Sequence, residues 1–170
     1  MFPGRDNPRG DSRHEETVGP SSYELLFICT GNYYRSRFAE CYLRREAARL
    51  GLPWCATSRG LDIDQPQNVG PMSKYALAAL RALDVDPAPL RPPLQLRDED
   101  LERATRVVVV DRQEHRPMMA RQFGAWLDRV EYWQIEDIDR ATPDDALVRL
   151  RIELDVLISG LTPMKAAGGR

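Results

Sequence analysis

The chain has 170 residues, of which 42% are hydrophobic and 29% charged, a composition typical of one globular domain with a buried core. Its 24 Lys and Arg residues against 26 Asp and Glu residues give a formal net charge of −2, whereas proteins that bind nucleic-acid backbones usually carry a basic excess. No apolar run approaches the roughly 18 residues of a membrane span, and the N-terminus lacks an apolar signal core. We therefore expect a cytoplasmic protein with neither a nucleic-acid nor a membrane partner.

Residues 1–21 are polar and rich in Gly, Pro and Arg, which predicts a disordered N-terminal tail. We expect the folded domain over residues 22–163 and a short C-terminal tail over residues 164–170. Inside the domain, the apolar run Leu25–Ile28 predicts a strand covered on both faces, and Trp54–Thr57 predicts a second strand.

Two helices are predicted in this first half of the chain. The first starts at Ser36 and stops at Gly51, and the second has Ser73 as its cap. The apolar face of the first helix consists of Phe38, Ala39, Tyr42, Leu43, Ala47 and Leu50, and that of the second consists of Ala76, Leu77, Leu80 and Leu83.

The second half continues the alternation with a short helix over Asp98–Ala104, a strand over Val107–Val110 and a fourth strand over Val130–Ile135. Thr142 and Pro143 mark the start of a last helix, which Gly160 and Pro163 would close. Its apolar positions are Leu147, Leu150, Leu154, Leu157 and Leu161. Strands alternating with helices predict an α/β fold, a parallel sheet wrapped on both faces, with ligands bound beyond the carboxyl ends of its strands.

The loop after the first strand carries the strongest chemical signal. It reads Cys29-Thr30-Gly31-Asn32-Tyr33-Tyr34-Arg35-Ser36. Gly31 and Asn32 permit a positive φ, so the backbone N–H groups from Thr30 to Ser36 can converge on one anion at a helix N-terminus. Arg35 would bind two oxygens of that anion, which predicts a phosphate site formed by residues 30–36.

The same surroundings favour a thiolate on Cys29, and a thiolate facing a phosphate indicates attack on phosphorus and a phosphocysteine intermediate. The alternative is an inert core cysteine beside a surface Arg35. Cys41 and Cys55 are interpreted as packing residues. The three cysteines cannot all pair and lack C-x-x-C spacing, which predicts free thiols and no metal site.

This loop resembles the phosphate loop of low-molecular-weight protein tyrosine phosphatases. The resemblance rests on Phe27-Ile28-Cys29-Thr30-Gly31-Asn32, Arg35-Ser36 and Ala39-Glu40, and extends to Ala56-Thr57-Ser58, to Asp98–Leu101 before a strand ending at Asp111, and to Ile135-Glu136-Asp137. It implies a flavodoxin-like three-layer fold with a four-stranded parallel sheet. It also implies hydrolysis of phosphate monoesters without metal or cofactor.

The resemblance assigns a role to each matching residue. Cys29 would be the nucleophile, Arg35 the transition-state clamp and Asp137 the general acid. Asn32 would hold the loop conformation, and the Ser36 hydroxyl would stabilise the thiolate. The expected substrate is a phosphotyrosine protein or a small aryl phosphate, the product is inorganic phosphate, and the protein would be a monomer or weak homodimer.

The chain departs from the family pattern at several of these positions. Arg37 replaces a proline, Tyr34 replaces a second loop cysteine, and Ile138 and Asp139 replace a proline and an aromatic residue after the acid. A serine that supports the loop asparagine is matched to Cys55, and a His-x-x-Arg segment is matched to Arg91-Pro92-Pro93-Leu94. These departures keep the nucleophile and the clamp but alter the acid loop and the support network, which favours phosphate binding over efficient turnover. An acidic Asp139 near the mouth would repel an anionic ester, which argues against selectivity for phosphotyrosine.

Two alternatives to the phosphatase follow from these departures. One is a phosphate- or phosphoprotein-binding module that has lost turnover. The other is an arsenate reductase that uses an external small thiol, because Cys41 and Cys55 are poorly spaced to relay a disulfide.

Overall fold

The computed structural model describes residues 23–161, so the tails expected at residues 1–21 and 164–170 lie outside the described part of the chain. The elements in chain order are β1 (Tyr23–Cys29), α1 (Arg35–Leu50), β2 (Trp54–Gly60), α2 (Lys74–Ala82), α3 (Asp98–Arg103), β3 (Arg106–Val109), α4 (Arg112–Gln122), the 3₁₀ helix η1 (Gly124–Trp126), β4 (Glu131–Tyr132) and α5 (Pro143–Leu161).

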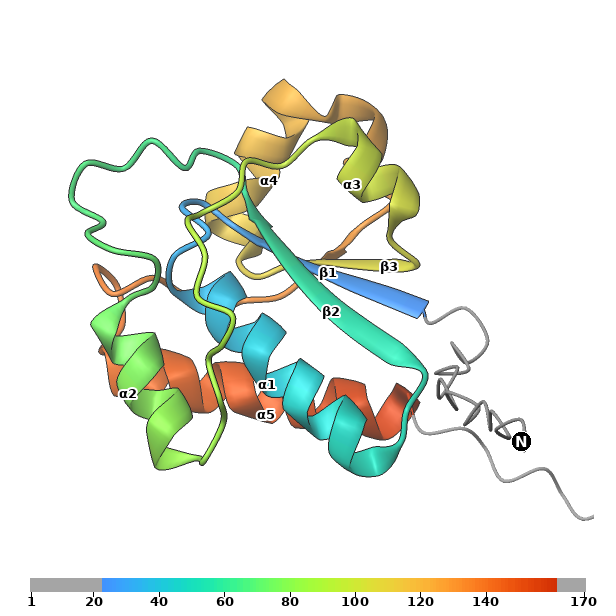
Figure 1. Cartoon of the computed structure of the whole chain (residues 1–170). Helices are drawn as coiled ribbons and strands as arrows, with labels where there is room; N and C mark the ends of the chain where they lie inside the picture. Colours follow the sequence, from blue (N-terminus) through green and yellow to red (C-terminus); the bar gives the residue numbers. More distant parts are fainter. Residues whose placement is uncertain (1–22, 162–170) are drawn as a thin grey trace, which may run out of the picture.

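The strands form one sheet in the order β2-β1-β3-β4, and every neighbouring pair is parallel. Helices α1, α2 and α5 cover one face of the sheet, and α3 and α4 cover the other (Figure 1). This arrangement confirms the predicted three-layer α/β fold with a four-stranded parallel sheet.

The central strand β1 supplies both hydrophobic cores. Alternate side chains of a strand point to opposite faces, so Leu25 and Phe27 pack with α1 and α5, whereas Leu26 and Ile28 pack with α3 and α4. All four side chains have 0% exposure, as the uninterrupted apolar run predicts.

The predicted helix boundaries largely hold. Gly51 ends α1 at φ +64°, the Ser73 hydroxyl accepts from the Tyr75 N–H, and the Thr142 hydroxyl accepts from the Asp145 N–H. Leu50 is an exception, since its side chain is 43% exposed rather than part of the buried face. Pro163 lies outside the described residues.

Several elements differ from the sequence prediction, among them the unpredicted 3₁₀ helix η1. Strand β2 extends to Gly60, and β4 is only two residues long. No helix was predicted over α4, because its sequence is polar and contains Pro117. Asp111 caps this helix by accepting from the Gln113 N–H, and its tertiary position brings the first turn to the end of β1.

Candidate active site

The loop after β1 lies where the strand order changes direction, because β1 is flanked by β2 and β3. Two other segments lie at the same edge of the sheet as this loop, namely the one between β2 and α2 and the one before α5 (Figure 1). Parallel strands present their carboxyl ends at one edge, so loops distant in sequence meet there.

Hydrogen bonds between side chains fix the conformation of this loop. The Cys29 Sγ is buried and lies 2.9 Å from the Ser36 Oγ. Asn32 has φ +49° and is fully buried, and its side-chain amide donates to the hydroxyls of Ser36 at 3.0 Å and Ser58 at 2.8 Å. A left-handed Asn therefore turns the chain around the sulfur, as the sequence predicts.

The turn leaves backbone donors free. Within residues 23–161, the N–H groups from Gly31 to Ser36 donate to no protein acceptor, and no side chain caps the N-terminus of α1. Such a run of N–H groups at a helix N-terminus is suited to bind an anion.

The match of the supporting serine to Cys55 is wrong. Ser58 takes that place, whereas Cys55 pairs in register with Glu24 near the other end of β2. Side chains alternate between the two faces along β2, and this alternation places Ser58 on the buried face next to the loop. The Asn32 Oδ1 is held as well, by the Leu94 N–H at 2.9 Å and by Arg91 at 3.0 Å.

Arg37, which stands at a proline position of the family, is paired inside the protein. It is 1% exposed and donates to Glu40 at 2.7 Å. Glu40 also accepts from Ser58 and Arg91, and these two bind the loop. The departure at residue 37 thus adds a buried guanidinium beside the Glu40 carboxylate that supports the loop, while the Arg37 Nε and Nη2 are buried and have no hydrogen-bond partner among the described residues.

Arg35 is the cation of the site and is 2% exposed. Its Nη1 and Nη2 donate to the two oxygens of Glu114 at 2.9 and 3.1 Å, and Nη1 also donates to the Ile135 carbonyl at 2.8 Å. Burial alone lowers the pKa of Arg35, but the Glu114 hydrogen bonds and the negative charges of Cys29 and Asp137 outweigh it and raise that pKa.

Sequence reasoning missed Glu114. The available signal was Asp111 as an N-cap, since a helix starting there would place Glu114 in its first turn at the carboxyl edge of the sheet.

Asp137 lies at the site, as predicted. Its Oδ2 is 3.3 Å from the Arg35 Nη2, and its side chain is 38% exposed. Its Oδ1 accepts from the Ile138 N–H at 2.8 Å, which orients the carboxylate. Asp139 lines the same pocket.

The pocket above the loop has a volume of about 840 Å³ and is lined by Cys29, Thr30, Gly31, Tyr33, Tyr34, Arg35, Gln65, Gln67, Asn68, Val69, Met72, Ser73, Lys74, Tyr75, Leu77, Glu114, Asp137, Ile138 and Asp139. Aromatic and aliphatic side chains form much of its wall above the charged base. Tyr34 is buried, and burial together with the Asp137 carboxylate raises the pKa of its phenol to about 12. Its hydroxyl donates to the Pro143 carbonyl at 3.2 Å, so Tyr34 joins the loop to α5.

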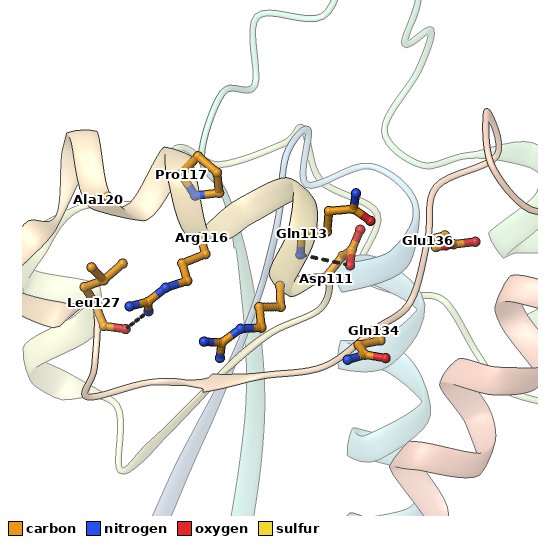
Figure 2. A pocket seen from close by; sticks show the side chains of 9 residues that line it. Asp111, Gln113, Arg116, Pro117, Ala120, Leu127, Gln134 and Glu136 are labelled. Carbon is orange, nitrogen blue, oxygen red and sulfur yellow. Dashed lines mark hydrogen bonds between the residues drawn. The ribbon is translucent and has the colours of Figure 1, made fainter.

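A second pocket, of about 620 Å³, lies between α4 and the segment after β4 (Figure 2). It contains Asp111, Arg116 and Glu136 but neither Cys29 nor Arg35. The nucleophile candidate and the free N–H groups therefore belong to the first pocket. In residues 23–161, no group of three His, Cys, Asp or Glu side chains is arranged to hold a metal ion, and no helix there is long and apolar enough to cross a membrane.

The sequence profile of a family described as "Low molecular weight phosphotyrosine protein phosphatase" matches residues 24–141. The chain belongs to this family. No curated protein matches it in a sequence comparison.

Similar solved structures agree with this assignment. The low molecular weight protein tyrosine phosphatase from T. tengcongensis is 26% identical, with a TM-score of 0.70 over 82% of this chain and 100% of that one. A YwlE mutant from Bacillus subtilis is 27% identical, with a TM-score of 0.65 over 83% of this chain and 97% of that one. A cysteine-to-serine mutant of the YwlE arginine phosphatase, with a phosphorylated active-site serine, is 25% identical. Its TM-score is 0.64 over 82% of this chain and 93% of that one.

Proposed function

We propose that this protein hydrolyses phosphate monoesters without a metal, through a phosphocysteine intermediate on Cys29. The observation that carries the proposal is the loop after β1. There the buried Cys29 Sγ lies 2.9 Å from the Ser36 Oγ, and the backbone N–H groups of residues 31–36 donate to no acceptor among residues 23–161. Membership of a phosphatase family supports the same chemistry. The phosphorylated serine of the YwlE mutant supports attack on phosphorus by an active-site side chain.

The reaction would proceed in two steps. First, the Cys29 thiolate attacks phosphorus, the bond between phosphorus and the ester oxygen breaks, and Asp137 donates a proton to the leaving oxygen. Then water attacks the phosphocysteine, Asp137 accepts a proton from that water, and the thiolate and inorganic phosphate are released. Arg35 and the N–H groups would bind the phosphoryl oxygens in both steps, and the Ser36 hydroxyl would stabilise the thiolate.

The substrate we propose is a phosphotyrosine protein or a small aryl phosphate. Tyr33, Tyr75 and Ile138 line the pocket above its charged base, and apolar walls of this kind suit an aromatic ring.

Phosphoarginine is a second candidate substrate. The YwlE relative is described as an arginine phosphatase, and the pocket of this chain carries Asp139 beside Asp137, where a guanidinium would find two carboxylates. Turnover of a phosphotyrosine peptide and of a phosphoarginine peptide of the same sequence, measured by phosphate release, separates the two substrates.

A binding module without turnover is the main competing function, because Ile138 and Asp139 alter the segment around the acid. Stopped-flow measurement of p-nitrophenol release distinguishes this binding module from a phosphatase. A phosphatase gives sustained turnover of p-nitrophenyl phosphate, whereas a burst followed by negligible turnover indicates the binding module. An arsenate reductase would instead require a small thiol and arsenate.

Replacing the nucleophile tests the thiol mechanism. Cys29→Ser should abolish hydrolysis and leave phosphate binding detectable, because the N–H groups and Arg35 remain. Phosphate release and calorimetric titration with phosphate measure the two properties. Appreciable hydrolysis by Cys29→Ser would contradict a phosphocysteine mechanism, and loss of phosphate affinity would contradict the proposed anion site.

A further inference from the structure

The guanidinium that should receive a phosphoryl group is already occupied by a side chain of the protein. Glu114 presents both carboxylate oxygens to the outer edge of Arg35, at 2.9 and 3.1 Å. This is the planar two-point contact by which arginine binds carboxylates and phosphates alike. Glu114 makes it from the pocket side, since its side chain is 26% exposed and lines the pocket together with Cys29.

Two further contacts hold Glu114 in this position. The Thr30 hydroxyl donates to its Oε1 at 2.6 Å, and the His115 Nε2 lies 3.3 Å from the same oxygen. Burial alone would raise the pKa of Glu114, but the hydrogen bonds from His115 and Arg35 hold it well below its ordinary value. The carboxylate is therefore ionised at neutral pH, and acidification within the physiological range does not release it.

The charges around Arg35 oppose simultaneous binding of Glu114 and a phosphate. Arg35 already faces Glu114 and, at 3.3 Å, Asp137, and the sulfur of Cys29 lies close enough to act on its charge. A phosphoryl dianion on the same guanidinium would add a fourth anionic group to Glu114, Asp137 and the Cys29 thiolate around one cation. Like charges at such distances repel strongly in a partly desolvated site.

The buried surroundings also contain an unused donor and acceptor. In the described part of the chain, the Arg35 Nε and the Asp111 Oδ2 are buried and have no hydrogen-bond partner. Asp111 is near enough for the Arg35 charge to lower its pKa, against the larger effect of burial, which raises it. In its present orientation the Arg35 guanidinium pairs with Glu114, while its own Nε and the Asp111 Oδ2 stay without a partner. These two atoms are available for hydrogen bonds in another orientation of the guanidinium.

We propose that Glu114 is a tethered anion that holds Arg35 in the free protein and must be displaced when a phosphate ester binds. This inference rests on the proposed function and adds a residue that sets the affinity of the site. Because the tether is intramolecular, only the fraction of molecules with Glu114 released is ready to bind, and the apparent Kd equals the intrinsic Kd divided by that fraction.

Phosphate affinity of a neutral, equally sized variant tests the proposal. Calorimetric titration of inorganic phosphate at fixed ionic strength should give a Kd at least about tenfold lower for Glu114→Gln than for the unmodified protein. Glu102→Gln, which neutralises an exposed acid of α3, is the matched control and should leave the Kd unchanged. The KM for p-nitrophenyl phosphate should fall with the Kd.

A spectroscopic measurement on the unmodified protein provides a second test. The ¹³C resonance of the Glu114 carboxyl carbon, identified by its absence in Glu114→Gln, should shift on saturation with phosphate. A resonance that stays in place, or an unchanged Kd in Glu114→Gln, would show that the carboxylate does not lie in the path of the anion. Weaker binding by Glu114→Gln would mean that Glu114 orients Arg35 for binding, the opposite role.

Outcomes that contradict the role of Glu114 are distinct from outcomes that contradict the proposed function. Hydrolysis of p-nitrophenyl phosphate that depends on Cys29 establishes the function whatever Glu114 does. If neither the unmodified protein nor Glu114→Gln binds phosphate, both the anion site and the displacement are contradicted.

Discussion

At the scale of single residues, the site depends on which atoms each side chain can reach. Cys29 has a hydroxyl within hydrogen-bond distance, and Arg35 has its outer edge on Glu114 and one nitrogen near Asp137. Asp137 is held by Arg35 in the free protein. If the guanidinium turns to a phosphate, this carboxylate loses its partner and is free to hold or give a proton at the leaving oxygen.

Asp137→Asn should reduce turnover chiefly for esters with poor leaving groups, since these need protonation most. For phenyl phosphate we expect a loss of kcat of ~10²–10⁴-fold, and for p-nitrophenyl phosphate a smaller one. Steady-state rates with the two esters provide the comparison. Asp139→Asn serves as control and should leave kcat for both esters nearly unchanged, whereas loss of its negative charge at the pocket should lower the KM. If Asp139→Asn is the more damaging change, the acid has been assigned to the wrong carboxylate.

At the scale of elements, the phosphate loop depends on how closely β2 approaches it. A Cβ on Gly60, the last residue of β2, would lie 2.7 Å from the Thr30 carbonyl oxygen and 3.0 Å from the Asn32 backbone nitrogen. Both atoms belong to the loop backbone, which cannot yield as a flexible side chain would. A glycine at this position lets strand and loop pack in direct contact.

Gly60→Ala should therefore weaken phosphate binding by displacing the loop. We expect the phosphate Kd to rise by about tenfold or more, measured by calorimetric titration. Gly160→Ala in α5 is the matched control, because its Cβ would meet no atom within 4 Å. It should leave the Kd unchanged and stabilise the helix by about 0.5–1 kcal/mol. Equal phosphate affinities in the two variants would contradict the close contact.

Helix α1 connects to the loop through the buried Glu40. This carboxylate accepts from Arg37 and Arg44 at 2.7 Å each, and from Ser58 and Arg91. Glu40→Ala would leave the buried Arg37 without its counter-ion, and breaking a buried pair in this way costs about 3–5 kcal/mol. Urea unfolding followed by circular dichroism measures the loss.

The control for Glu40 is Glu153→Ala, an exposed acid of α5, which should change the free energy of unfolding by no more than about 0.5 kcal/mol. Similar midpoints for the two variants would mean that Glu40 does not compensate the charge of Arg37.

At the scale of the whole molecule, the strand register separates Cys29 from Cys55, two of the three free cysteines among residues 23–161. Cys29 is in register with Gly60 on β2, and Cys55 precedes Gly60 by five residues. At ~3.3 Å per residue this places their Cα atoms roughly 16 Å apart, well beyond the ~7 Å limit for a disulfide. Burial raises the pKa of Cys41, whose sulfur lies 3.9 Å from the Pro87 carbonyl oxygen, so its thiol stays protonated.

Peroxide should therefore inactivate the protein progressively, with poor recovery in dithiothreitol. An oxidised Cys29 has no neighbouring thiol to form a protective disulfide, so sulfenic acid proceeds to sulfinic acid. Mass spectrometry of the Cys29 peptide follows the products, and Cys55→Ser should lose activity at the same rate. Full recovery through a Cys29–Cys55 disulfide would be incompatible with the strand register.

The sequence determined the features that are local or periodic. The apolar run of β1, the leucine spacing of α5 and the Gly51 stop are set by side chains within a few residues of one another, and all three hold in the structure. The loop from Cys29 to Ser36 is also local, because Asn32 and the start of α1 together determine its turn.

Only the tertiary structure decided which distant residues complete the site. Ser58, Arg91 and Glu114 reach the loop from β2, from the segment before α3 and from α4, over sequence separations that no local pattern encodes. The match to Cys55 failed for this reason, since the register of β1 with β2 decides which β2 residue faces Asn32. Packing of parallel strands brings their carboxyl ends together, and that proximity alone brings Glu114 to Arg35.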